Sequence, residues 1–261
     1  MFRLQATLAS RLRLHLVQVM SRRQVDKFLQ LLKASPSGAV FNPWWQVDRQ
    51  NDIARTAPMI RRQQLTAYLQ QRLGRAKVVV IGEALGYRGG HFTGIAMTSE
   101  RILLGKQATI AAALSERRNR VGDGGRRPPL QILSSVEPRR TSKPSVCAHG
   151  FSEPTATIVW GALLKIGVSP DEFVIWNAFP WHSFDPRRGM LSNRMPNKSE
   201  QLCGRAVLNA FLGLFPCQQI VALGKIAAAQ LEQLGVKARC VRHPASGGAR
   251  LFREQIARIV R

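Results

Sequence analysis

Apolar residues along this chain follow two alternating patterns. Short apolar runs predict strands over residues 78–81, 173–176, 219–223 and 238–241, and the continuous β-branched run of 78–81 is typical of a strand that is buried on both faces. Apolar positions at helical spacing predict helices over residues 60–73, 154–166, 198–215, 226–234 and from about 249 to the end of the chain. Strands that alternate with helices indicate an α/β fold, which we expect to be a three-layer α/β/α arrangement around a central parallel sheet of about four strands.

Two basic segments interrupt this pattern. The first 25 residues hold five arginines and no acidic residue, which is typical either of a transit peptide or of a basic N-terminal arm. Residues 105–150 lose their periodicity among glycine, proline and arginine, and they predict a long basic loop, either a disordered insertion or a flap that contacts phosphates. We therefore divide the chain into a basic, helical extension over residues 1–60 and a main domain over residues 61–261, with the basic insertion at about 105–150.

The overall charge narrows the classes of function. The 261 residues carry a formal net charge of +24, and 45% of them are hydrophobic. Such a chain can bury a core, and its charge favours a polyanionic partner such as nucleic acid. The alternative is a basic surface that is simply solvated. No apolar run reaches the ~18 residues that a bilayer-spanning helix needs, so we expect no membrane partner.

The cysteines give no sign of a metal centre. All four are scattered along the chain and form no CxxC pair, which favours a reducing compartment. We expect a cytoplasmic location, at the nucleoid if the source is bacterial. Cys147-x-His149 and Cys240-x-x-His243 are each only half of a metal site. We therefore expect neither a metal ion nor another cofactor.

Polar motifs follow three of the predicted strands. They are Gly82-Glu83-Ala84-Leu85-Gly86, Asn177-Ala178-Phe179-Pro180 and His243-Pro244-Ala245-Ser246. Taken one at a time, a glycine turn can hold phosphate, an asparagine can cap a turn and a histidine can be structural. Open α/β sheets bind their ligands at the carboxyl ends of the strands, so the three motifs together predict a shared site at that edge.

This order of motifs resembles the uracil-DNA glycosylase superfamily over roughly residues 76–261. One large branch of that family has a first motif of the form Gly-Glu-Ala-Pro-Gly, and Gly90-His91-Phe92-Thr93-Gly94 is similar to the Gly-x-Pro-Phe-like element that follows it. Leu85 stands where the family usually has proline, and Gly247 stands where many members carry a bulky residue that enters the base stack. The early CxxC of the cluster-bearing branch is missing, so an iron–sulfur cluster is not expected.

The resemblance and the residue chemistry together suggest catalytic roles. Glu83 is expected to orient water and to stabilise the positive charge that develops on the sugar, although a carboxylate here could instead cap a helix. His243 is expected to donate a hydrogen bond to the pyrimidine O2, as a neutral or a charged ring. Asn177 is expected to read the O4 and N3–H edge of uracil, which cytosine does not match.

Other residues are expected to surround the base and the phosphates. Phe92 would stack on the base, with a core aromatic as the alternative. Gly82 and Ala84 would bring backbone amides close to the base. Phosphates are expected where exposed amides meet a cation at the start of the last helix. The residues concerned there are Ser246, Gly247 and Arg250.

These roles predict a DNA repair enzyme. It would be a monofunctional hydrolase that flips uracil out of DNA, cleaves the N-glycosidic bond and leaves an abasic site. We expect it to act as a monomer on single- and double-stranded DNA. The alternatives are a glycosylase for another damaged base, such as hypoxanthine or 5-hydroxymethyluracil, and a non-catalytic nucleic-acid-binding module of the same fold.

Overall fold

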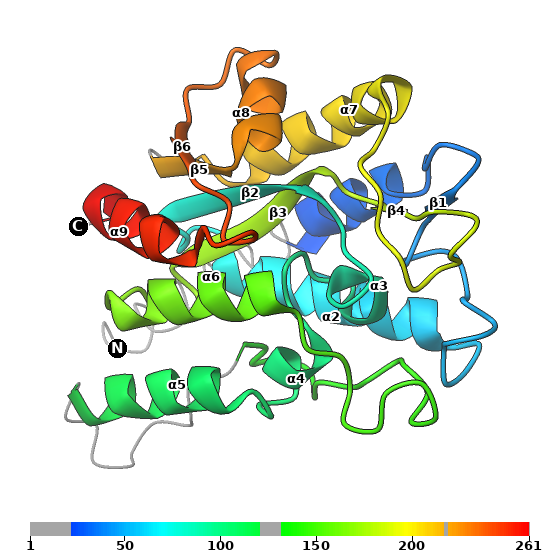
Figure 1. The fold of residues 1–261 in the computed structure, drawn as a ribbon, viewed down its shortest axis with the longest axis horizontal. Coiled ribbons are helices and arrows are strands. Elements are labelled where there is room, and N and C mark those ends of the chain that lie inside the picture. The colour runs from blue at the N-terminus through cyan, green and yellow to red at the C-terminus, as the bar shows by residue number, and fades with distance from the viewer. Residues whose placement is uncertain (1–21, 121–131, 217–218, 261) are drawn as a thin grey trace, which may run out of the picture.

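The centre of the fold is a sheet of four parallel strands. The computed structural model describes residues 22–120, 132–216 and 219–260. Val78–Ala84 (β2), Phe173–Phe179 (β3), Gln219–Leu223 (β5) and Arg239–Val241 (β6) form the sheet in the order β3-β2-β5-β6. Every neighbouring pair in it is parallel. The sheet and the helices on both of its sides confirm the predicted three-layer fold (Figure 1).

Helices pack on both sides of this sheet (Figure 1). α7 (Lys198–Leu214) and α8 (Lys225–Glu232) lie on one side, and α6 (Pro154–Lys165) and α9 (Ala249–Val260) lie on the other (Figure 1). α2 (Ala57–Arg72) runs alongside the edge strand β3 and bonds to it through side chains. All five begin and end within a few residues of the boundaries that the apolar spacing predicts.

Residues 105–150 are more regular than the sequence predicts. Ala108–Arg120 form α5, which packs against α6, so the prediction of a continuous loop is wrong there. The stretch is rich in alanine and arginine, which are strong helix formers, and it contains no glycine or proline. Further along, the buried carboxylate of Glu100 in α4 (Glu100–Leu103) accepts hydrogen bonds from the N–H groups of Thr141 (2.8 Å) and Ser142 (3.0 Å).

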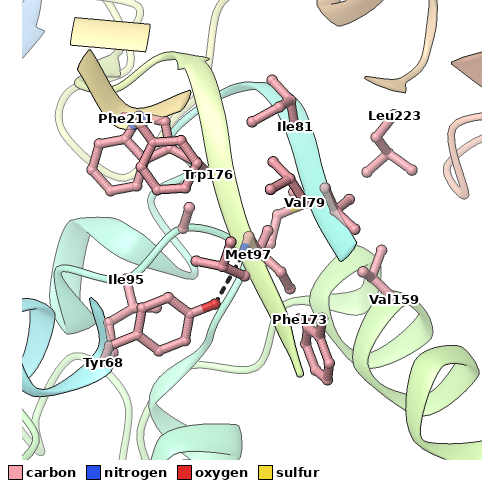
Figure 2. Packing of buried hydrophobic residues seen from close by; sticks show 14 of the residues in the cluster. Tyr68, Val79, Ile81, Ile95, Met97, Val159, Phe173, Trp176, Phe211 and Leu223 are labelled. Carbon is pink, nitrogen blue, oxygen red and sulfur yellow. Dashed lines mark hydrogen bonds between the residues drawn. The ribbon is translucent and has the colours of Figure 1, made fainter. Parts of the chain in front are cut away.

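The hydrophobic core lies between the sheet and its helices. Trp176 on β3 stacks on Phe211 of α7 with ring centroids 5.0 Å apart. Figure 2 shows this contact and the hydrogen bond that the N–H of Ile175 donates to the hydroxyl of Tyr68 over 2.9 Å. Because β3 is an edge strand, this hydroxyl satisfies a backbone N–H that lacks a neighbouring strand.

Residues before position 61 share the same core. Phe28, in a helix over residues 22–31, meets Trp176 edge to face at 5.3 Å. Val40–Phe41 (β1) pairs antiparallel with His182–Ser183 (β4) beside the main sheet. The domain boundary at residue 60 stays a prediction, but residues on both of its sides belong to one buried cluster.

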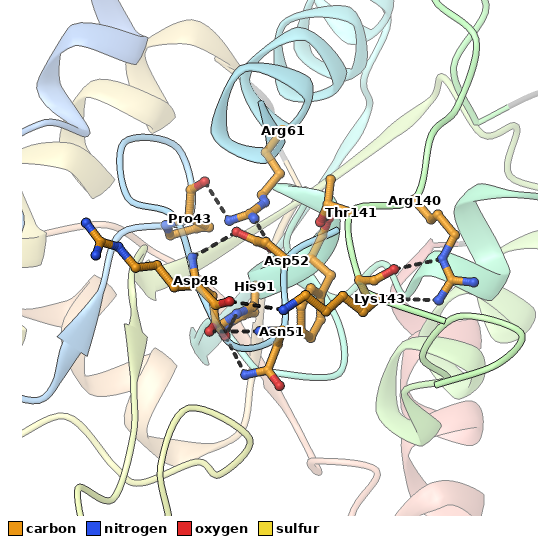
Figure 3. A network of polar contacts seen from close by, with 12 residues as sticks. Pro43, Asp48, Asn51, Asp52, Arg61, His91, Arg140, Thr141 and Lys143 are labelled. Carbon is orange, nitrogen blue, oxygen red and sulfur yellow. Dashed lines mark hydrogen bonds and ion pairs between the residues drawn. The ribbon is translucent and has the colours of Figure 1, made fainter. Parts of the chain in front are cut away.

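A buried polar network joins this early segment to α3 (Gly90–Thr93). Asp52 forms an ion pair with Arg61 of α2, and Oδ2 of Asp48 lies 3.1 Å from Nε2 of His91 (Figure 3). All four side chains are almost completely buried. Because a buried charge is tolerated only when it is paired, these contacts fix the segment that carries Asp48 and Asp52 against α2 and α3.

Arg72 is a fully buried cation that ties the end of α2 to the start of β3. Its guanidinium donates hydrogen bonds to the backbone oxygens of Tyr68 (2.9 Å), Phe173 (3.0 Å) and Pro170 (2.6 Å). It also lies over the ring of Tyr68, 3.7 Å from the centroid. One side chain therefore satisfies buried carbonyl groups both in α2 and in the segment that leads into β3.

Replacing Arg72 by methionine should lower the free energy of unfolding by about 3 kcal/mol, because buried carbonyl oxygens lose their donor. Arg75 provides the matched control, since its side chain is 66% exposed and pairs with Asp171. Arg75→Met should cost less than about 1 kcal/mol. Urea unfolding of both variants measures the difference, and equal losses would show that the buried bonds of Arg72 add nothing.

Candidate active site

The carboxyl ends of β2 and β3 border a cleft of about 340 Å³. Glu83 at the end of β2, Asn177 on β3 and His243 after β6 all line it. The structure therefore brings together the three motifs that the sequence places at separate strand ends. Gly82 and Ala84 line the same cleft. The chemical roles of these residues stay predictions.

Asn177 lies against Gly82. The two residues are Cα partners in neighbouring parallel strands, and Asn177 is 1% exposed. A Cβ atom added at Gly82 would lie 2.6 Å from Oδ1 of Asn177, so only glycine leaves room for the amide. The buried Nδ2 of Asn177 has no hydrogen-bond partner among the described residues. An unpaired buried donor costs free energy, which a ligand with an acceptor atom would recover.

Glu83 presents a partly buried carboxyl group between Gly82 and Ala84. Burial raises the pKa of Glu83 above its ordinary value, because water no longer fully solvates the charged form. A carboxyl group in this setting can take up a proton from water or stabilise a positive charge nearby.

The loop after β6 fixes the tautomer of His243. The N–H of Ala245 donates a hydrogen bond to Nδ1 of His243 over 3.1 Å, so a neutral ring carries its proton on Nε2. Burial, together with the cation of Arg242, lowers the pKa of His243 and favours this neutral form. The ring can therefore donate one hydrogen bond from Nε2, as the predicted contact with a base oxygen requires.

Glu153, the residue before α6, is a second carboxyl group in the cleft that sequence reasoning missed. Its Oε2 is buried without a hydrogen-bond partner in the described part of the chain. A Cβ atom at Gly89 would lie 2.0 Å from this oxygen, so the carboxyl occupies space that a glycine leaves open. Burial raises the pKa of Glu153 to about 7, against the opposing effect of the Arg88 cation. In sequence it is an ordinary acidic residue before a helix.

The segment between β4 and α7 forms another wall of the cleft. Asn193, Arg194 and Met195 line it, and no motif marks them in the sequence. Oδ1 of Asn193 accepts a hydrogen bond from the N–H of Tyr87 over 3.0 Å. This bond joins the wall to the turn that follows β2.

Phe92 is placed differently from the other predicted site residues. It is fully buried and stacks on Phe151, with ring centroids 4.7 Å apart and planes 4° apart. It is not among the residues that line the cleft. Its contact in this structure is therefore with the core, and base stacking by Phe92 stays a prediction.

The predicted phosphate contacts lie on the loop between His243 and α9, where Ser246 and Gly247 are exposed, and in the first turn of α9, which carries Arg250. Ser246 and Gly247 have left-handed backbone angles, with φ of 52° and 75°. Arg250 has an 89% exposed side chain and pairs with Glu254 over 3.2 Å. The loop continues the chain from His243 but does not line the cleft itself.

Residues 22–120, 132–216 and 219–260 contain no candidate metal centre and no candidate membrane helix. No group of three His, Cys, Asp or Glu side chains there could hold a metal ion. No helix in the same ranges is both long and apolar enough to cross a membrane. Cys147, Cys203 and Cys240 are free thiols. The absence of a cofactor stays a prediction.

A parallel sheet with a polar cleft at the carboxyl ends of its strands defines an α/β protein with a ligand site at that edge. The family model described as the uracil DNA glycosylase superfamily matches residues 71–258, which is more than half of the chain. The protein belongs to this superfamily and has the fold of its DNA glycosylases. The predicted family is thus confirmed.

Comparison with individual proteins adds support for the fold. The crystal structure of wild-type SMUG2 from Pedobacter heparinus is similar, with a TM-score of 0.54 and 13% sequence identity, over 90% of this chain and 95% of that one. No curated protein matches the chain. At this level of identity the likeness shows the fold and leaves the substrate open.

Glu153→Gln should change how stability depends on pH. The folded protein holds the proton of Glu153 more tightly than the unfolded chain does, where the carboxyl has its ordinary pKa of 4.5. The stability that this proton contributes is complete below pH 4.5 and is lost as the pH rises to about 7. The wild type should therefore lose stability relative to the variant between pH 5 and pH 8.

Urea unfolding of both proteins at the two pH values measures this effect. Glu232→Gln, at an exposed position, is the control and should follow the wild type. A constant difference between the wild type and Glu153→Gln at the two pH values would contradict the raised pKa.

Proposed function

We propose that this protein is a monofunctional uracil-DNA glycosylase, a hydrolase of base excision repair that leaves an abasic site. The observation that carries the proposal is the amide of Asn177. Its buried Nδ2 lacks a partner among the described residues, and it shares one cleft with Glu83 and His243. A base edge that supplies an acceptor and a donor would complete this site.

Uracil fits the hydrogen-bonding groups of Asn177. The Nδ2–H group can donate to O4 of the base, while Oδ1 can accept from N3–H. Cytosine presents a donor and an acceptor in the opposite places, so both groups of the amide would stay unpaired. Because unpaired buried polar groups are costly, this arrangement discriminates strongly between the two bases.

The placement of the other two residues supports cleavage of the glycosidic bond in the proposed reaction. As the C1′–N1 bond breaks, its electron pair goes to the base, and the oxygen of a water molecule bonds to C1′. Glu83 in its ionised form accepts the proton that this water loses and stabilises the positive sugar. Nε2–H of His243 donates to O2, where negative charge builds on the departing uracil.

Two further observations support a monofunctional enzyme that acts on DNA. The described residues that line the cleft include no lysine, so no amine is placed to attack the sugar and start a lyase reaction. The net charge of +24 favours binding to the phosphate backbone. We propose that Ser246, Gly247 and Arg250 contact phosphates beside the cleft. We also propose that the protein acts as a monomer in the cytoplasm.

The test is excision from end-labelled oligonucleotides that carry uracil, hypoxanthine, 5-hydroxymethyluracil or only normal bases. Alkali converts each abasic site into a strand break, which a gel resolves. We expect breaks in the uracil substrate and none in the normal one. Cleavage confined to another base would contradict uracil as the substrate. Binding without cleavage of any probe would indicate a non-catalytic module.

Glu83→Gln should lower the single-turnover rate of uracil excision by about 100-fold, because the amide cannot accept the proton of water. DNA affinity should stay within a few-fold of the wild type, since the charge pattern that binds phosphate is almost unchanged. Glu232→Gln is the control for the loss of one carboxylate and should keep the wild-type rate. An equal loss of rate and affinity would assign Glu83 a structural role instead.

A further inference from the structure

Extracting a nucleotide from a duplex opens a gap in the base stack. Proteins that distort DNA in this way often fill the gap with an apolar side chain, and methionine is one of those used. Gly247 has no side chain that could do so. If the proposed function holds for duplex DNA, another side chain near the cleft would fill this gap, and an apolar one suits the base stack.

We propose that Met195 enters the base stack when the nucleotide is extruded. Met195 is 60% exposed and lines the cleft. The other large apolar residues exposed in the described part of the chain do not line it; they are Leu31, Ile53, Met59, Leu202 and Leu251. Met97 also lines the cleft but is only 6% exposed and belongs to the core.

The backbone that carries Met195 is firmly held. The guanidinium of Arg194 forms an ion pair with Glu200 at 2.6 Å, and it also donates to the backbone oxygens of Phe184 (3.0 Å) and Met195 (3.1 Å). Pro196 follows, and the side chain of Asn197 caps α7. A fixed backbone loses little entropy when DNA binds, so the interactions of an inserted side chain are not offset by loop ordering.

The methionine side chain itself is free to adapt. It has three rotatable bonds and a polarizable sulfur, which suits contact with bases of different shape. Its exposure means that it adds little to the hydrophobic core, because most of its surface stays in water. A rigid support and an adaptable apolar tip are the two features that insertion between bases requires.

The segment between β4 and α7 also carries exposed positive charges that could contact DNA phosphates. Arg187 and Arg188 are exposed between β4 and α7, and the exposed Lys198 begins α7. Phosphate contacts of this kind set the position of a protein on the duplex without reading its sequence. The segment thus offers cations for the backbone and an apolar side chain for the stack, beside the cleft that would receive the base.

The experiment compares single-turnover rates on uracil in a single strand and in a U·A duplex. Met195→Ala should lower the duplex rate by about tenfold more than the single-strand rate, because a single strand has no duplex stack to hold open. Met195→Leu should keep most of the duplex rate, since leucine also fills the gap. Leu202→Ala, which truncates a 59% exposed side chain outside the cleft lining, should change neither rate.

The outcomes separate this inference from the proposed function. A wild-type protein that cuts uracil in neither substrate would overturn the proposed function, and the inference with it. A second case is a wild type that cuts both substrates while Met195→Ala lowers the duplex and single-strand rates by the same factor, or lowers neither. Either result would overturn the role of Met195 and leave the proposed function standing. The role of Met195 would also be overturned if Met195→Leu lowered the duplex rate as much as Met195→Ala does.

Discussion

The parallel register that sets Gly82 beside Asn177 is the constraint on which the candidate site depends. β2 and β3 pair from Val78 and Phe173 onwards, and both runs are buried on both faces of the sheet. Because side chains alternate along a strand, a slip of one residue would turn the amide of Asn177 to the opposite face. The apolar runs of the two strands therefore fix the place of the polar group that follows them.

Much of this arrangement could be predicted from the sequence. A continuous β-branched run indicates a buried strand, and parallel strands end at one edge of the sheet, so Glu83, Asn177 and His243 could be expected to meet. The sequence left the tautomer of His243 open, since it depends on the distance between Nδ1 and the N–H of Ala245. This distance is set by the folded loop, so the tautomer cannot be predicted from the pattern of residues.

Residues placed by tertiary packing could not be found in this way. Glu153 precedes a helix and Met195 lies in an irregular segment, and only the fold brings both to the cleft. Phe92 is the opposite case: its motif predicts a base contact, which stays a prediction, while its ring in this structure packs on Phe151. The sequence does not predict the helix α5, because the glycines and prolines that follow it within residues 105–150 indicate a loop for the segment as a whole.

Gly82→Ala tests the central claim, that the amide of Asn177 reads the base from its place against Gly82. The added methyl group would lie 2.6 Å from Oδ1 of Asn177 and 2.9 Å from Cε of Met97, which are ends of side chains that can move. We therefore predict a variant that folds with nearly the wild-type thermal midpoint but has lost about 100-fold in single-turnover uracil excision, as its displaced amide no longer pairs with the base. Wild-type excision by a folded Gly82→Ala protein would contradict the account.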